Sequence, residues 1–134
     1  MPAGHLSLGR RGEEAAAAFL RKKGYKVLDR NWRARGGELD IVCQAKKTVV
    51  FAEVKTRTQG QMATPHDALT PAKRRNLVRA ASEWLTRNEA WNRPCRFDLV
   101  AVVVDADGLV CVEHVENAFD LTPGAGGQGS WQPW

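Results

Sequence analysis

The sequence predicts an α/β domain with a restriction-endonuclease-like layout, in which a mixed β-sheet is flanked by helices in the order α-β-β-β-α-β-β. Two segments have the composition and capping signals of helices, and five short apolar runs bounded by turn residues have the composition of strands. This order favours helices packed against one sheet. The chain has 134 residues, 43% of them hydrophobic and 26% charged, which is enough for a core without disulfide or metal staples.

The first half of the chain contains a helix followed by three strands. Alanines and long side chains predict a helix over residues 10–23, which ends at Gly24. Strands are expected after it, separated first by a basic, glycine-bearing turn and then by a short polar turn: 25–32, 38–44 and 48–55. The second and third of these strands are expected to form a hairpin.

The second half begins with a segment that has no clean period, 56–69, which we expect to be a mobile loop. Thr70 and Pro71 are typical of an N-cap and a first helical position, and the helix they open should run to about Arg87. Two strands follow, 97–105 and 109–115, joined by an Ala-Asp-Gly turn. We therefore expect a flexible start over 1–8, one domain over 9–121 and a disordered glycine-rich tail over 122–134.

Charge is distributed unevenly. The formal net charge is +5, and residues 10–35 carry nine Lys and Arg, whereas residues 97–134 carry none and six acids. This distribution favours one basic face that meets an anionic polymer. The alternative is that the high isoelectric point has no such meaning, because many basic soluble proteins bind no nucleic acid.

The cysteines and the apolar runs limit the class of protein. Cys43, Cys95 and Cys111 are odd in number and lack a CxxC pair, so we interpret all three as reduced and structural and expect no zinc site. No apolar run reaches the length of a membrane span, and the first residues lack the apolar stretch of a secretory signal. We expect a cytoplasmic protein with no membrane partner.

Four charges stand inside two of the predicted strands: Glu38, Asp40, Glu53 and Lys55. Side chains alternate across a strand, and a hairpin turning at 45–47 brings Asp40 near Glu53 with Lys55 beside them. Two close carboxylates repel unless a cation lies between them, and hard oxygen ligands with the Val54 carbonyl suit Mg²⁺ or Mn²⁺. The alternative is a set of ordinary surface ion pairs.

Several motifs carry a resemblance to a known family. Asp40 followed by Glu53-Val54-Lys55 resembles the PD-(D/E)xK motif of restriction-endonuclease-like nucleases, with Leu39 where a proline often precedes the first acid. The stretches GRRGEEAAAAFLRKKGY, NWRARGGELDIV, FAEVKTR, TPAK and RFDLVAV together resemble the YraN-type family. That family of small bacterial proteins is grouped with endonucleases and is similar to archaeal Holliday-junction resolvases. The resemblance covers residues 9–121.

The resemblance implies a divalent metal, a nucleic-acid substrate and roles for particular residues. Asp40, Glu53 and Lys55 would be catalytic, and Asp40, Glu53 and Glu13 would hold the metal. Glu13 lies eleven residues before Gly24, as a helix glutamate does in the resolvase-like pattern, and on the face of Leu20. The alternative for Glu13 is an acid favoured by the helix dipole. Glu38 is either an acid behind the ligands or a partner for an arginine.

The expected substrate is DNA, and its phosphates are expected to contact Arg33, Arg35, Arg57 and Lys73 around the acidic site. The resulting hypothesis is a metal-dependent endonuclease that hydrolyses phosphodiesters in DNA, with branched or structured DNA as the implied form. The alternative is a nucleic-acid-binding or scaffolding protein that keeps the fold without cutting, and an RNA-processing nuclease would use the same chemistry. A homodimer is expected only by analogy with two-fold branched substrates.

Overall fold

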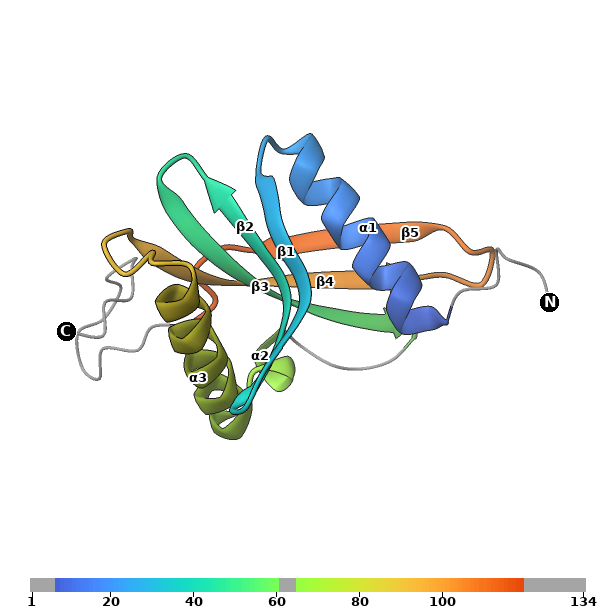
Figure 1. The fold of residues 1–134 in the computed structure, drawn as a ribbon. Helices are drawn as coiled ribbons and strands as arrows, with labels where there is room; N and C mark the ends of the chain where they lie inside the picture. Colours follow the sequence, from blue (N-terminus) through green and yellow to red (C-terminus); the bar gives the residue numbers. More distant parts are fainter. Residues whose placement is uncertain (1–6, 61–64, 120–134) are drawn as a thin grey trace.

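The computed structural model describes residues 7–60 and 65–119, and it has the predicted order of elements (Figure 1). The expected flexible start and tail fall almost entirely outside these residues. The elements, with their bounds, are α1 (Leu8–Lys22), β1 (Lys26–Ala34), β2 (Gly37–Ala45), β3 (Thr48–Thr58), α2 (Pro65–Ala68), α3 (Pro71–Arg87), β4 (Cys95–Val104) and β5 (Val110–Val115). The α/β class and the mixed sheet flanked by helices are confirmed.

The five strands form one sheet in the order β1-β2-β3-β4-β5. β3 and β4 run parallel, and all the other neighbours run antiparallel. Parallel neighbours need a crossover connection, which α3 supplies, whereas the antiparallel pairs are joined by tight turns. The three central strands, β2, β3 and β4, are covered by α1 on one face and by α3 on the other.

Each face of the sheet has its own apolar core. Ala16, Ala17 and Leu20 of α1 pack on one face, against a set of side chains from the central strands: Ile41, Cys43, Val50, Ala52, Val100 and Val102. Leu77 and Trp84 of α3 pack on the other face, with Phe51 and Phe97 among their neighbours. Burial on both faces explains why the strands read as nearly continuous apolar runs.

Gly12 sets how closely α1 approaches the sheet. It is buried, and a Cβ at this position would overlap the side-chain hydroxyl of Thr56 on β3. Gly9, one turn earlier, has nothing within 4 Å of such a Cβ. Only at Gly12 does the missing side chain allow the close approach that carries Glu13 towards the strands.

Two local expectations were wrong. The segment 56–69 was expected to be a loop, but β3 continues to Thr58 because it remains paired with β4, and the short α2 forms later in the segment. Cys111 was interpreted as a structural cysteine, but it is exposed, because in the described sheet β5 pairs with β4 alone and lies at the edge. Cys43 and Cys95 are buried, and all three cysteines are free thiols.

Within residues 7–60 and 65–119, none of the helices has both the length and the apolar character needed to cross a membrane.

Candidate active site

The charged residues of the predicted site gather where β2 separates from β3. These strands are paired only as far as Ile41 and Ala52, whereas β1 stays paired with β2, and β3 with β4, beyond this point. The β1–β2 hairpin therefore bends away from the sheet as a unit, towards α3 (Figure 1). We call the resulting opening the fork.

The bend changes which face a side chain occupies. Strict alternation predicts Leu39 on the face of Ile41 and Cys43, but this was wrong: Leu39 joins the core under α3, and the other two join the core under α1. The tip of the hairpin is held by close contacts with α3. A Cβ at Gly36 would lie 2.6 Å from the Arg79 Cβ, so only glycine fits there without a shift.

Asp40 occupies the end of the β2–β3 ladder. Its Oδ2 accepts a hydrogen bond of 2.8 Å from the backbone N–H of Val54 on β3, where the backbone pairing of the two strands has stopped. A side chain thus replaces the missing backbone acceptor. This bond fixes the Asp40 carboxyl beside the segment that carries Glu53.

Glu53 is buried beneath α3, and its two oxygens differ. Oε2 lies 3.0 Å from the Lys73 Nζ, and the glutamate side chain is 10% exposed. Oε1 is buried and has no hydrogen-bond partner among the described residues. The Asp40 and Glu53 carboxyls lie within hydrogen-bonding reach of each other, but two ionised carboxylates provide no donor, so they bond only when they share a proton.

As a consequence, this pair holds one proton more tightly than an ordinary glutamate does. Burial, followed by the charge of Asp40, raises the pKa of Glu53 to about 7, although Lys73 opposes the rise. Burial also raises the pKa of Asp40, against the lowering effect of the Val54 N–H bond. The pair therefore favours either a shared proton or a cation near its oxygens.

Glu13 approaches the same fork from the other face of the sheet. It is half-buried on α1, and burial, followed by the charge of Asp40, raises its pKa. Glu14 is exposed and forms an ion pair with Arg30 at 3.0 Å. The structure thus brings Glu13 into electrostatic range of Asp40 and turns Glu14 away from it.

The donor set at the fork suits a magnesium-like ion with few protein ligands. In the described part of the chain, no group of three or more His, Cys, Asp and Glu side chains is arranged to hold a metal. The buried, unpartnered Oε1 of Glu53 and the adjacent Asp40 carboxyl nevertheless match Mg²⁺, which commonly takes one or two carboxylates and completes its shell with water and substrate oxygens. Ligation by Glu13 stays a prediction.

Lys55 and the three arginines predicted to contact phosphates differ in how far their side chains are exposed to solvent. Lys55 is exposed on β3, and Arg35 is exposed at the tip of the hairpin. Arg33 is 85% exposed at its side chain and pairs with Glu38 at 3.2 Å, so Glu38 is an arginine partner here. Arg57 is only 8% exposed, so a phosphate at the surface does not reach it without movement of the side chain.

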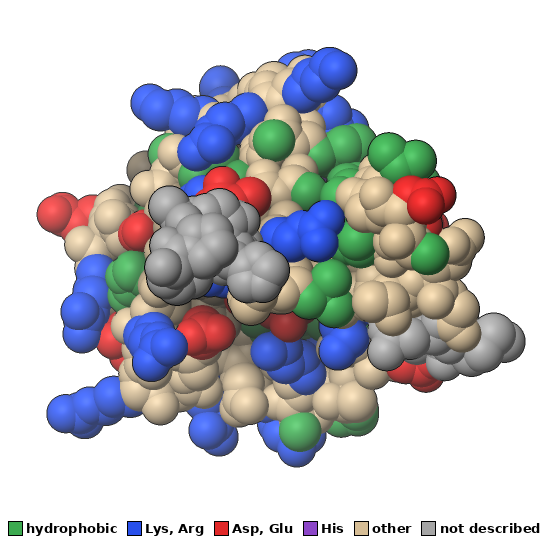
Figure 2. Space-filling view, turned by 90° about the vertical axis from the view of Figure 1, so that its right-hand side faces the viewer, with side chains coloured by type: hydrophobic (Ala, Val, Ile, Leu, Met, Phe, Trp, Pro, Cys, Tyr) green, Lys and Arg blue, Asp and Glu red, His purple; other side chains and the backbone are tan. Residues whose placement is uncertain are grey.

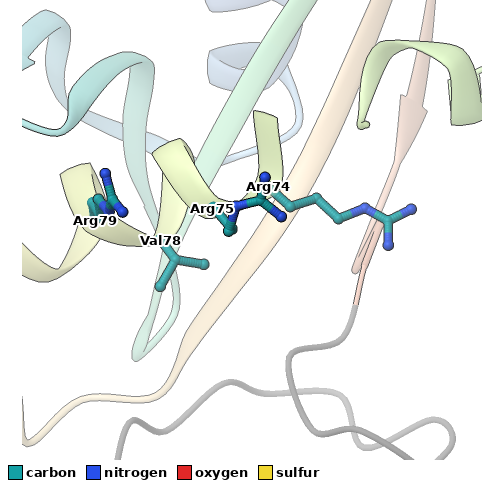
Figure 3. Close-up of a pocket in the computed structure, with 4 residues that line it drawn as sticks. All are labelled: Arg74, Arg75, Val78 and Arg79. Carbon is teal, nitrogen blue, oxygen red and sulfur yellow. The ribbon is translucent and has the colours of Figure 1, made fainter. Parts of the chain in front are cut away.

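A further basic feature lies on α3, beside the hairpin tip. Arg74, Arg75, Val78 and Arg79 line a surface hollow of about 310 Å³. Figure 3 shows these side chains projecting from successive turns of α3, with Arg74 extended away from the other three. On the side of the molecule where α1 begins, Lys and Arg are spread over the face with Asp and Glu between them (Figure 2). On this side, the positive charge does not form one continuous patch.

Comparison with known proteins places the chain in a family. The sequence profile described as "Uncharacterised protein family UPF0102" matches residues 12–102. The chain belongs to this family. It is 51% identical over 128 residues to a UPF0102 protein of Nitratidesulfovibrio vulgaris, covering 94% of each chain. It is 41% identical over 128 residues to a UPF0102 protein of Lawsonia intracellularis, covering 95% of this chain and 96% of the relative.

Sequence reasoning missed two charged arrangements in this UPF0102 chain. One is the pairing of Lys73 with Glu53, which joins residues from α3 and β3 and leaves no local pattern. The other is the buried Asp98, which binds Arg96 through two bonds of 2.8 Å and His114 through one of 2.7 Å, on the α1 face of the sheet. An aspartate inside the apolar run RFDLVAV was the available signal for the second.

Proposed function

We propose that this UPF0102 protein is a metal-dependent nuclease that hydrolyses phosphodiester bonds in DNA in the cytoplasm. The observation that carries the proposal is the close carboxyl pair at the fork, in which Glu53 is buried with its Oε1 unpartnered and the half-buried Asp40 is fixed by the Val54 N–H. Holding two carboxyls side by side away from bulk water costs stability, and such costs are concentrated at functional sites. The resemblance to PD-(D/E)xK nucleases supports the same assignment.

Each residue at the fork has a distinct role in this proposal. Asp40 and Glu53 hold Mg²⁺ or Mn²⁺, and the ion supplies Lewis-acid activation of a phosphate group and of water. Lys55 is exposed one alternate position beyond Glu53 on β3, where its ammonium stabilises negative charge that develops on the phosphate. Glu13 contributes negative charge from the α1 side.

The substrate class follows from charge and from the shape of the fork. Arg33 and Arg35 are exposed on a hairpin that projects from the sheet, and arginines at such a tip bind backbone phosphates without reading bases. The resemblance to junction resolvases favours branched or structured DNA over a linear duplex. An RNA substrate would use the same residues, so the two nucleic acids are compared in the test below.

The test is cleavage of labelled branched DNA, linear duplex DNA and single-stranded RNA with Mg²⁺, Mn²⁺ or chelator. We expect metal-dependent cleavage of branched DNA that is lost in Asp40→Asn and in Glu53→Gln. Glu14→Gln is the matched control, because Glu14 is an exposed acid next to Glu13 and pairs with Arg30 away from the fork. Cleavage that survives in both fork variants would show that the activity belongs to another site or a contaminant.

A second candidate is a nucleic-acid-binding or scaffolding protein that does not cut. The contact between Lys73 and Glu53 favours it, because an internal cation already balances one of the two carboxyls. This candidate predicts DNA binding that weakens steeply with salt and does not depend on Asp40 or on a divalent ion. The cleavage assay and a binding assay in chelator separate the two candidates.

A further inference from the structure

Lys73 is the cation that contacts the carboxyl pair at the fork, through Glu53. Its Nζ lies 3.0 Å from Glu53 Oε2, while its side chain remains 41% exposed. Burial alone would lower the pKa of Lys73, but the charges of Glu53, Asp40 and Glu38 outweigh this and raise it. The ammonium therefore stays ionised and acts as the counter-ion of the site.

The position of Lys73 is unfavourable for the helix that carries it. Thr70 is the N-cap of α3, and its side chain accepts a hydrogen bond from the Lys73 backbone N–H. The first turn of α3 has no acidic residue, and the positive end of the helix dipole disfavours cations there. The helix dipole therefore does not favour Lys73 at this position, whereas its contact with Glu53 does.

A divalent ion held by Asp40 and by Glu53 Oε1 would share the Glu53 carboxylate with Lys73, whose ammonium lies on Oε2, and two cations on one carboxylate repel each other. Once the carboxyl pair has lost its shared proton, with Lys73 in place, the three groups carry one net negative charge, which repels a phosphate. If a divalent ion replaces the ammonium at Glu53, the same groups and the ion carry one net positive charge. The site then attracts a phosphate only after it is loaded.

We propose that Lys73 is a displaceable counter-ion, which neutralises Glu53 before a divalent ion binds and moves to a nucleic-acid phosphate when the ion binds. This rests on the proposed function, because it assumes that the carboxyl pair binds a metal. The exposed, four-carbon stem of Lys73 permits the movement without a shift of α3. The lysine thereby couples metal loading to phosphate affinity.

Calorimetric titration of Mg²⁺ without nucleic acid tests the competition directly. We expect Lys73→Gln to bind Mg²⁺ about fivefold more tightly than the wild type, because one competing cation is removed. Arg75→Gln is the matched control: Arg75 is exposed in the same turn, makes the same charge change, and forms no ion pair with the described residues. Equal affinities in these two variants would overturn the proposal but leave the proposed function intact.

Two further measurements test whether Lys73 moves when a divalent ion binds. In the wild type, the NMR signals of the Lys73 side chain should shift when Mg²⁺ is added, and this requires no variant to fold. The affinity for a short DNA duplex should increase when chelator is replaced by Ca²⁺. This increase should be about fivefold larger in the wild type than in Lys73→Gln. An unchanged lysine signal in a protein that binds Mg²⁺ would overturn the displacement. Absence of Mg²⁺ binding in all three proteins would instead refute the proposed function.

Discussion

Replacing Glu53 by Gln is expected to change the free energy of unfolding more favourably at pH 8 than at pH 5, when both proteins are measured without a divalent ion. In the folded chain, burial and the charge of Asp40 raise the pKa of Glu53 from 4.5 to about 7. This difference corresponds to about 3 kcal/mol of unfavourable free energy when the buried group is ionised. The side chain is only 10% exposed, so solvent does not screen most of this cost.

The sign follows from proton binding. The folded protein holds the Glu53 proton more tightly than the unfolded chain does, so this group favours folding below about pH 4.5. Its contribution is lost progressively as the pH rises through about 7. Glutamine at the same position does not titrate, so the variant should lack this decline.

Urea unfolding of both proteins at pH 5 and pH 8, in chelator, measures the effect. The free energy of unfolding of Glu53→Gln relative to the wild type should rise by about 2.5 kcal/mol between the two pH values, because part of the effect is already lost at pH 5. Glu14→Gln serves as the control, because the hydrogen bond from Arg30 lowers the pKa of this exposed acid and no gain at pH 8 is expected. Parallel pH profiles for the wild type and Glu53→Gln would refute the electrostatic account of the fork.

Three further predictions concern the ligand and the scaffold. Affinity for Mg²⁺ should increase from pH 6 to pH 8 with release of a proton, because the raised pKa of Glu53 must be overcome; calorimetry in two buffers measures this, and a pH-independent affinity would contradict it. Asp98→Ala should lower the free energy of unfolding in urea by about 3–5 kcal/mol, because Arg96 loses its buried partner. Gly12→Ala should lower the thermal midpoint, because its Cβ has no space, while Gly9→Ala should stabilise by about 0.5–1 kcal/mol through helix propensity; the opposite order would contradict the close approach of α1.

The convergence of Asp40 and Glu53 was predictable because it depends on local rules. Alternation within a strand and a short polar turn are enough to bring residues equidistant from that turn together, and the structure does so. The second helix was equally local, since Thr70 caps it and Pro71 begins it. The preference for Glu13 over Glu14 followed from the resolvase-like spacing before Gly24 and, independently, from helical periodicity, which places Glu13 on the face of Leu20.

The remaining features of the fork depend on contacts between distant segments. Alternation does not reveal that β2 pairs with β3 only from Ile41 onward, and the unpaired part of β2 before Ile41 turns Leu39 towards α3. The contact of Lys73 with Glu53 depends on how α3 lies over the sheet, and the burial of Arg57 depends on neighbours far along the chain. No periodicity in a single segment encodes such packing.

Anomalous diffraction from a crystal of the protein soaked in Mn²⁺ would locate the ion. We expect a peak at the fork, within coordination distance of a carboxylate oxygen of Asp40 and of Glu53, with the Lys73 ammonium moved away from Glu53. Mn²⁺ bound only elsewhere, with the contact between Lys73 and Glu53 intact, would show that these two carboxyls are not metal ligands.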